Sequence, residues 1–219
     1  RWAFLLSTTA AFLVLGVLAR PIVQGEIYYQ NDLQDMHLAY RAFYAGCLER
    51  GDRFEWCPSL HGGYYLHGEG QAGMYHPLHL FLYRTLPLAP ALDLEILSGY
   101  AFACAGTFLF LRRWRLGRGS SSFGAFLFGL SGFNLLHLTH VNAVGVVGHL
   151  PWLLLAIDVS IRTSSRRPRA LAGAAIALLT GSQFLLGYPQ YVYFSALAEV
   201  AYAVAVAWSS GRGRRLFAF

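Results

Sequence analysis

The sequence predicts an all-α, polytopic transmembrane helical bundle with a large first loop outside the membrane. Hydrophobic residues make up 56% of its 219 residues and charged residues only 13%, and the mean hydropathy is +0.42. Soluble domains carry close to a quarter charged residues. The apolar residues are gathered in stretches long enough to cross a bilayer as helices. Nine of the 11 acidic residues lie in one polar segment, 20–95.

Six stretches are expected to span the membrane. They are residues 2–19, 94–111, 121–138, 143–161, 170–187 and 191–208. Short turns join the third stretch to the fourth and the fifth to the sixth, which predicts antiparallel helical hairpins. The first stretch is expected to be a retained helix, because no cleavage site followed by a soluble domain is found after it. Residues 1–219 are expected to form the N-terminal part of a longer transmembrane domain, because the chain has no initiator Met and stops where a new apolar run begins.

The arginines predict the orientation of the bundle. All 17 basic residues are Arg, and 11 of them follow the second, fourth and sixth spans, in segments 112–118, 162–169 and 212–215. Cytoplasmic connections carry an excess of basic residues. Segment 20–95 instead holds five Arg against nine Asp or Glu. The N-terminus is therefore expected to be cytoplasmic and the loop 20–93 extracytoplasmic. Because the basic residues connect spans, the net charge of +6 does not indicate nucleic-acid binding.

The first part of the loop, residues 31–51, has the pattern of an amphipathic helix. Apolar residues recur in it at three- and four-residue spacing from Leu33 to Leu48. Asn31 is the expected N-cap, and Gly51 suits the C-terminal end. Asp32 and Asp35 then lie in the first turn on roughly one face, where they either cap the helix or act as catalytic carboxylates.

A second loop segment, 77–92, is apolar but interrupted by Arg84, Pro87 and Pro90. It is too broken to span the bilayer and is expected to lie along the membrane interface before the second span. Between the two segments lies Trp56–Pro77, WCPSLHGGYYLHGEGQAGMYHP, which is polar and rich in glycine. Membrane proteins place such groups on water-facing surfaces. This stretch therefore marks the expected functional face of the molecule.

Histidines gather on the same side of the predicted bundle. All eight lie in the loop or near the loop-side ends of the spans, as a polar cavity facing outward would require; tolerance of His at membrane interfaces is the alternative. Their spacing matches no zinc signature. Hydrogen bonding to a polar ligand or to the loop backbone is favoured over a metal site, and no cofactor is indicated. Cys47 and Cys57 both lie in the loop, and whether they form a disulfide is left open.

Two acids lie within the predicted spans. Glu199 is near the middle of the sixth, where it is either functional or part of an interhelical hydrogen bond. Asp158 precedes Arg162 by four residues, which predicts an ion pair at the helix end. The chain has no phosphate-binding glycine loop, nucleophile elbow or dinucleotide fingerprint, which disfavours ATPase, hydrolase and dehydrogenase functions.

The order of short motifs resembles the YfhO-type family of bacterial membrane proteins, within the type-C glycosyltransferase superfamily. That family has an Asp opening a helix after the first span, followed by Gly, Trp-Asn-Pro, Gly-Gly, Gln and Tyr-Pro. The matching positions here are Asp32, Gly51, Trp56-Cys57-Pro58, Gly62-Gly63, Gln71 and Tyr75-His76-Pro77, and later His149-Leu150-Pro151-Trp152 and Gly187-Tyr188-Pro189-Gln190. Cys57 replaces the usual Asn, His76 separates Tyr from Pro, and Tyr188 stands where the family often has His.

The resemblance implies a transferase on the outer face of the bacterial cytoplasmic membrane. It would move a sugar from a polyprenyl-phosphate donor to an envelope polymer or lipid acceptor. Asp32 would act as general base on the acceptor hydroxyl, with Asp35 as the second candidate. The substrate-binding candidates are Glu69, Gln71, Tyr75, His76, Arg84, His149 and Gln190, of which Arg84 would face the departing phosphate.

Two other functions fit the same sequence. A transporter or flippase of a lipid-linked or polar substrate would need charged residues along a path at the membrane midplane, and Glu199 is the clear candidate. A non-catalytic envelope assembly factor would keep the scaffold without transfer activity. Loss of function in an Asp32→Asn variant that still folds would count against that last alternative.

Overall fold

Five helical segments of the computed structural model, which describes residues 2–210, are long and apolar enough to cross a membrane. They are α5 (Leu88–Arg113), the composite segment Arg118–Thr139, α8 (Val141–Arg162), α9 (Arg166–Leu186) and α10 (Pro189–Ser209). The first predicted span forms α1 (Trp2–Leu18), which is apolar but 17 residues long, followed by the short α2 (Arg20–Gln24). The chain is thus a multi-pass membrane protein built as an all-α bundle, as predicted.

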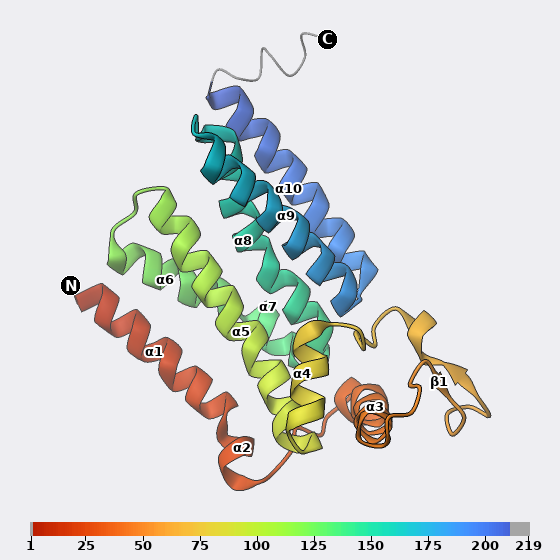
Figure 1. Ribbon diagram of the computed structural model, residues 1–219. Helices are drawn as coiled ribbons and strands as arrows, with labels where there is room; N and C mark the ends of the chain where they lie inside the picture. Colours follow the sequence, from red (N-terminus) through yellow and green to blue (C-terminus); the bar gives the residue numbers. More distant parts are fainter. Residues whose placement is uncertain (1, 211–219) are drawn as a thin grey trace, which may run out of the picture.

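Helix α8 lies at the centre of the bundle and packs against α5, α9 and α10 (Figure 1). Glycines let α5 and α8 approach closely. A Cβ added to Gly148 would lie 3.0 Å from the carbonyl oxygen of Gly99 on α5. One turn further along α8, the Trp152 indole donates a hydrogen bond to the Phe102 carbonyl, 2.9 Å away. Small residues at such crossings are how membrane helices gain packing contacts without a hydrophobic driving force.

The third predicted span, 121–138, is interrupted. Helix α6 (Arg118–Gly129) stops, and α7 (Gly132–Leu136) and the 3-10 turn η3 (His137–Thr139) continue after it. Asn134 satisfies the freed backbone groups: its Nδ2 donates to the carbonyls of Phe128 (2.7 Å) and Gly129 (3.2 Å). The backbone carbonyl of Asn134 accepts a hydrogen bond from the Tyr100 hydroxyl at 2.8 Å. Such a break is tolerated in a membrane only where the protein itself supplies these partners.

The second span also differs from the prediction at its start. Helix α5 begins at Leu88 rather than at residue 94, so the separate segment before it is only α4 (Pro77–Thr85). Pro90 lies in the first turn of α5, where backbone N–H groups have no helical partner, so the proline removes no hydrogen bond there. The residues 88–92, expected along the interface, therefore belong to the spanning helix.

The loop folds into short elements at one end of the bundle, called the loop end below. They are the π turn η1 (Leu33–His37), α3 (Leu38–Arg50), the antiparallel pair β1 (Trp56–Cys57) and β2 (Tyr64–Tyr65), and η2 (Leu66–Glu69). Figure 1 shows α3 end-on, so its axis crosses the bundle helices. The predicted helix 31–51 is confirmed from Leu33 onward, and Gly51 ends it in the left-handed conformation at φ +73°. Its start differs: the residue before the π turn is Asp32, and Asn31 adopts φ +44°.

A buried ion pair attaches this loop to the bundle. The Arg41 guanidinium on α3 meets the Glu95 carboxylate on α5 in two hydrogen bonds, Nε–Oε2 at 2.9 Å and Nη2–Oε1 at 2.6 Å. The two side chains are 1% and 3% exposed. The Tyr83 hydroxyl on α4 donates to Glu95 Oε2 at 2.6 Å, and His79 Nε2 lies 3.3 Å from Oε1. Loop and bundle therefore share one carboxylate.

The same guanidinium also fixes the loop backbone. Arg41 Nη1 donates to the Ala72 carbonyl, and Nη2 donates to Asn142 Oδ1 on α8 at 3.3 Å. Asn142 in turn donates through Nδ2 to the carbonyl of Gln71. Elements far apart in the chain, α3, α5, α8 and residues 71–72, are thus joined around one charged side chain.

Arginines occupy the opposite end of the bundle. Asp158 accepts hydrogen bonds from Arg113 Nε (2.6 Å) and Arg162 Nε (2.7 Å), so the predicted pairing with Arg162 is confirmed and extended to α5. The predicted cluster Arg212, Arg214 and Arg215 lies outside the described residues. Cys47 and Cys57 are both buried as free thiols.

Replacing Arg41 with Ala is expected to destabilise the protein by about 3–5 kcal/mol, because the Glu95 carboxylate stays buried without its counter-charge. Unfolding by SDS in mixed micelles measures this change. Arg50→Ala is the control, since it breaks an Arg50–Asp52 pair whose side chains are 59% and 56% exposed and should leave the unfolding curve nearly unchanged. Equal effects of the two substitutions would show that the buried pair does not hold the loop.

Candidate functional site

Asp32 lies at the loop end of the bundle, against the start of α8. Its Oδ2 is 3.1 Å from Nε2 of His140, the residue that precedes α8. The two side chains are 48% and 34% exposed, so the pair is open to a ligand while remaining in contact. A carboxylate held in this way by an imidazole can accept a proton from a bound hydroxyl group.

Aromatic rings surround this pair. The ring of His137 stacks on Phe133, with centroids 4.1 Å apart, and Nδ1 of His137 donates to the Phe133 carbonyl at 2.8 Å. Its Nε2 is then free to accept from the Tyr191 hydroxyl, 3.3 Å away. The Tyr191 ring lies 4.7 Å from that of Tyr188. Burial, followed by the neighbouring Tyr191 and then the Asp32 carboxylate, raises the pKa of Tyr188. We call Asp32, His137, His140, Tyr188 and Tyr191 the Asp32 cluster.

The turn that carries Tyr188 is strained and fixed. Tyr188 adopts φ +62° and ψ +60°, a left-handed conformation that is rare for a bulky residue. Its N–H donates to the carbonyl of Gly70 in the loop at 2.7 Å. Gly187 comes so close that an added Cβ would lie 2.4 Å from the same carbonyl oxygen. Strained backbone of this kind persists where surrounding contacts determine it and is concentrated at functional sites.

Behind the cluster lies His37, at the end of the π turn. It is 1% exposed, and both ring nitrogens are buried without a hydrogen-bond partner among the described residues. Burial, followed by the positive charge of Arg41, lowers the pKa of His37 to about 4. Asp32, His37 and Arg41 follow one another along the η1–α3 helix, so a neutral imidazole separates the exposed carboxylate from the buried ion pair. π turns recur at functional sites in other proteins.

A second polar group brings two of the predicted residues together. The Ser182 hydroxyl on α9 lies 2.8 Å from His76 Nε2 and 2.8 Å from His149 Nε2. His149 lies on α8, and His76 immediately precedes α4. These residues line a cavity of about 220 Å³ between α4, α5, α8 and α9, called the His76 cavity below.

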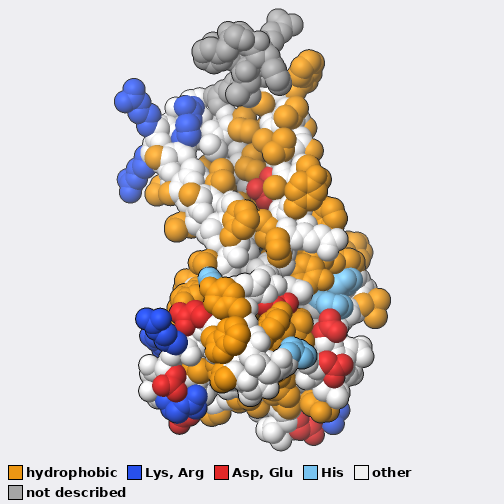
Figure 2. Space-filling view, turned by 90° about the vertical axis from the view of Figure 1, so that its right-hand side faces the viewer, with side chains coloured by type: hydrophobic (Ala, Val, Ile, Leu, Met, Phe, Trp, Pro, Cys, Tyr) orange, Lys and Arg blue, Asp and Glu red, His pale blue; other side chains and the backbone are white. Residues whose placement is uncertain are grey.

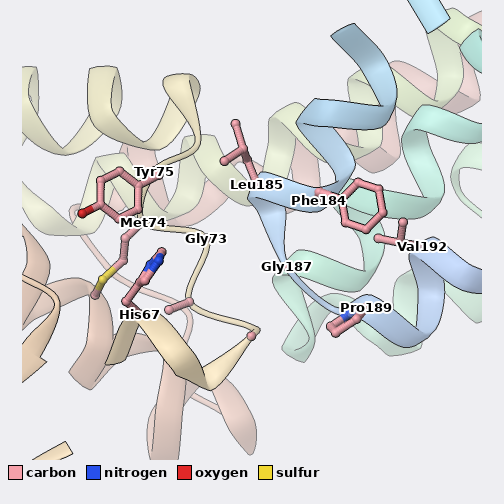
Figure 3. Close-up of a pocket in the computed structure, with 11 residues that line it drawn as sticks. His67, Gly73, Met74, Tyr75, Phe184, Leu185, Gly187, Pro189 and Val192 are labelled. Carbon is pink, nitrogen blue, oxygen red and sulfur yellow. The ribbon is translucent and has the colours of Figure 1, made fainter. Parts of the chain in front are cut away.

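A third hollow lies between the loop and the α9–α10 turn. It has a volume of about 190 Å³. Figure 3 shows His67, Met74 and Tyr75 on the loop side, and Phe184, Pro189 and Val192 on the side of α9 and α10. The Tyr75 hydroxyl points away from the turn and donates to Glu55 Oε1 at 2.7 Å. The polar tip of this candidate is therefore turned away from the hollow.

The remaining predicted residues are dispersed. Glu69 Oε2 accepts from the backbone N–H of Gln71 at 2.8 Å, and burial raises the pKa of Glu69. Gln190 is exposed next to Tyr191. The Asp35 side chain is exposed and forms no hydrogen bond or ion pair with any described residue, although its backbone N–H donates to the Asn31 carbonyl. Arg84 is exposed beside the C-terminal half of α3, at the other end of that helix from Asp32.

The sequence did not single out His140, Tyr188, Ser182, Asn142 or His37. His140 and His37 belong to the histidines noted on the loop side, and Tyr188 lies in a motif quoted above for its resemblance. A clear signal existed for Asn142 and Ser182, because both are polar residues at the loop-side ends of apolar helices. Nothing in the sequence identified their partners.

Glu199 participates in hydrogen bonding that connects three helices. Its Oε1 accepts from Ser195 Oγ at 2.7 Å within α10. Ser195 Oγ accepts from Gln183 Nε2 of α9 at 3.0 Å, and the same Nε2 lies 3.0 Å from the Val146 carbonyl of α8. Within residues 2–210, no group of three or more His, Cys, Asp or Glu side chains is arranged to hold a metal ion.

Comparisons with known proteins identify no relative. No family model, curated protein or solved structure matches the chain.

The protein is expected to lose stability as the pH falls from about 6.5 to 4. An unfolded chain binds protons at the ordinary histidine pKa of 6.5, whereas burial holds the pKa of His37 at about 4 and that of His76 at about 3. Protons therefore favour the unfolded state within this range. Removing the titration of His37 with His37→Leu should reduce the loss of unfolding free energy between pH 7 and pH 4 by about 3 kcal/mol.

The pH dependence is measured by SDS unfolding at a series of pH values. His61→Asn is the control, because His61 is exposed and Asn tolerates its left-handed backbone at φ +51°. It should retain the wild-type pH dependence. A His37→Leu profile as steep as that of the wild type would contradict the assignment of His37 as a buried neutral imidazole.

Proposed function

We propose that this protein is a membrane glycosyltransferase that moves a sugar from a polyprenyl-phosphate donor to a hydroxyl group of an envelope polymer or lipid. The observation that carries the proposal is the half-exposed Asp32 carboxylate, paired with His140 at 3.1 Å at one end of a membrane-spanning bundle. A base in this position is accessible from water while the lipid part of a donor stays in the bilayer. The family resemblance of the motifs around Asp32 supports the same function.

The proposed reaction uses these groups as follows. Asp32 accepts the proton of the acceptor hydroxyl while that oxygen forms a bond to the anomeric carbon of the sugar. The bond from that carbon to the phosphate oxygen breaks, and the polyprenyl phosphate leaves with the electron pair. His140 keeps the carboxylate oriented.

The aromatic residues of the Asp32 cluster would bind the sugar. Tyr188 and Tyr191 present ring faces with polar tips, which suits a ligand that has an apolar face and hydroxyl edges. Gln190, exposed between them in the chain, would reach a sugar hydroxyl. Arg84, on α4, lies beside the end of α3 that is far from Asp32. It would therefore not bind the sugar, and it would contact only a part of the substrate that extends beyond the Asp32 cluster.

We further propose that the loop faces the outside of a bacterial cytoplasmic membrane and that the N-terminus is cytoplasmic. The arginines of segments 112–118 and 162–169 lie at the end of the bundle opposite the loop, where positively charged residues mark the cytoplasmic side. Figure 2 shows basic side chains without acidic ones near that end, both acidic and basic side chains around the loop, and a mainly apolar surface between. This arrangement matches a bilayer between the two charged ends.

Replacing Asp32 with Asn is expected to lower sugar transfer by at least about 100-fold, because the amide cannot accept the proton. The full-length protein in native-lipid membranes is supplied with labelled polyprenyl-phosphate sugars and an envelope extract, and label transfer is compared at matched expression. Asp35→Asn is the control: it removes an exposed acid three residues away that has no partner among the described residues, and it should keep most of the activity.

Other outcomes of this experiment separate the alternatives. Transfer by both Asp32→Asn and the wild type would place the base elsewhere, with Asp35 next. Absence of transfer by the wild type across several donor sugars would contradict the glycosyltransferase function. It would favour a transporter instead, for which the partly exposed Glu199 on α10 is the residue to substitute.

The orientation is tested with reporter fusions. Alkaline phosphatase, which is active only outside the cytoplasmic membrane, should be active when fused after Thr85, and green fluorescent protein should be fluorescent when fused after Arg115. Both signals follow from the charge difference between the two ends. The reverse pattern would invert the molecule and place Asp32 in the cytoplasm, where the proposed donor is not exposed.

A further inference from the structure

A hollow lined by charged residues lies at the end of the bundle opposite the loop, where α5 and α8 end (Figure 1). Its volume is about 320 Å³. The described residues that line it are Arg113, Trp114, Arg115, Asp158 and Arg162, and we call it the arginine hollow. It shares no described residue with the Asp32 cluster or the His76 cavity, so it is a separate site.

One buried carboxylate holds two of these arginines in place. The Asp158 side chain is 3% exposed and accepts hydrogen bonds from Arg113 Nε on α5 and Arg162 Nε on α8, at 2.6 and 2.7 Å. The Tyr202 hydroxyl of α10 donates to the same carboxylate at 3.1 Å and accepts from the Trp114 indole at 3.0 Å. The Arg162 guanidinium also lies over the Trp114 ring, 5.4 Å from its centroid. Two guanidiniums from different helices are therefore fixed on the oxygens of one carboxylate.

Most of the hydrogen-bond donors of these guanidiniums are left without an acceptor. An arginine has five N–H donors, and among the described residues Arg113 and Arg162 each use only Nε. The two side chains are 37% and 35% exposed, so they are accessible from outside the protein. The Arg115 side chain is exposed and forms no hydrogen bond or ion pair with any described residue. The arginine hollow can therefore donate to a further acceptor.

Other arginines at this end have the role that is usual at a helix C-terminus, where basic side chains donate to free carbonyls. Arg112 Nη1 donates to the Leu116 carbonyl just after α5. Arg169 Nη2 donates to the Thr163 carbonyl just after α8, at 2.8 Å. Neither arginine lines the hollow. The side chains of the three arginines in the hollow donate to no described carbonyl, so helix capping does not account for them.

The third arginine occupies a backbone position that favours glycine. Arg115 follows the last residue of the α5 cap, Trp114, and adopts φ +62°. Glycine is the usual residue in this left-handed position after a helix, because a side chain there is strained. The arginine adds a positive charge to the hollow at that cost. Since Asp158 offsets one of the three guanidinium charges, two positive charges remain to attract an anion.

The position of the hollow in the bundle indicates the source of the anion. The hollow lies at the ends of membrane-spanning helices, and the half-exposed Trp114 is typical of the level of the lipid headgroups. Leu109, one turn before Arg113 on α5, is also exposed, so the adjoining surface is apolar. Guanidinium groups bind phosphate oxygens in pairs of hydrogen bonds. Basic pockets between helices at the cytoplasmic surface bind the phosphates of anionic lipids.

We propose that the arginine hollow binds the phosphate group of an anionic phospholipid from the adjoining leaflet. The terminal nitrogens of Arg113 and Arg162 donate to the phosphate oxygens, and Arg115 contributes a further positive charge. The acyl chains follow the apolar surface of α5 past Leu109 into the bilayer. This site is independent of the proposed sugar transfer, because it lies at the opposite end of the bundle from Asp32.

The test is native mass spectrometry of the full-length protein in detergent micelles with added phospholipid. Phosphatidylglycerol carries a net negative charge, whereas choline cancels the phosphate charge in phosphatidylcholine with the same acyl chains. Phosphatidylglycerol should bind the wild type at least about tenfold more tightly, the effect of two basic residues at a lipid surface. Millimolar inorganic phosphate should not displace it. Equal binding of the two lipids would overturn the proposal, and displacement by inorganic phosphate would overturn the assignment to a lipid.

Substitutions at this end separate the hollow from the general positive charge. Arg115→Gln should weaken phosphatidylglycerol binding by about fivefold. Arg112→Gln removes the same charge outside the hollow and is the control, and Asp32→Asn serves as a second control at the loop end. Both should bind this lipid as the wild type does. Equal losses in Arg115→Gln and Arg112→Gln would overturn the proposal, because binding would then depend on diffuse charge.

A triple variant removes the fixed pair of guanidiniums without leaving a buried charge. Arg113→Gln, Asp158→Asn and Arg162→Gln are combined, because the carboxylate alone would be destabilising once its partners are lost. SDS unfolding checks that this variant is folded. It should bind phosphatidylglycerol no more tightly than phosphatidylcholine. A folded triple variant that keeps the wild-type preference for phosphatidylglycerol would overturn the proposal.

Discussion

The ion pair between Arg41 and Glu95 determines how the loop sits on the bundle. Both groups are almost fully removed from water, and a pair of this kind is tolerated only when every donor and acceptor is satisfied. Here the partners come from α4, α8 and the backbone of residues 71–72. Because these contacts require one relative position of loop and helices, the pair fixes the start of α3 as well, and with it Asp32.

Two irregular segments complete the Asp32 cluster from the bundle side. The break between α6 and α7 lets the chain turn so that His137 and His140 precede α8, and Asn134 satisfies the backbone that the break exposes. The turn between α9 and α10 holds Tyr188 in a left-handed conformation against Gly70. Regular helices alone would have kept these side chains at separate helix ends.

The two polar regions differ in their exposure and therefore in the chemistry open to them. Asp32 and His140 are partly exposed and can exchange protons with bound hydroxyl groups and water. The imidazoles around Ser182 are buried and kept neutral, so they are suited to hydrogen bonding without proton transfer. His37 and the Arg41–Glu95 pair lie on the inner side of the Asp32 cluster and separate the exposed acid from the buried charges.

The sequence alone determined the membrane class, five of the six predicted spans and the helical part of the loop, because these depend on local composition and periodicity. It also identified Gly51 as the end of α3. The sequence did not predict the break in the third span or the early start of α5. The break depends on the hydrogen bonds of Asn134, and the start of α5 depends on Pro90 lying in the first turn of a helix. Hydropathy measures neither property.

Only the tertiary structure decided the partners. Arg41 and Glu95 are 54 positions apart in the chain, and His76 and Ser182 are 106 apart. Such pairs depend on which helix faces meet, and side chains of the same type elsewhere in the chain fit the local pattern equally well. The choice of Asp32 over Asp35 as the paired acid has the same origin, because His140 reaches one of them only when α8 and the loop are packed together.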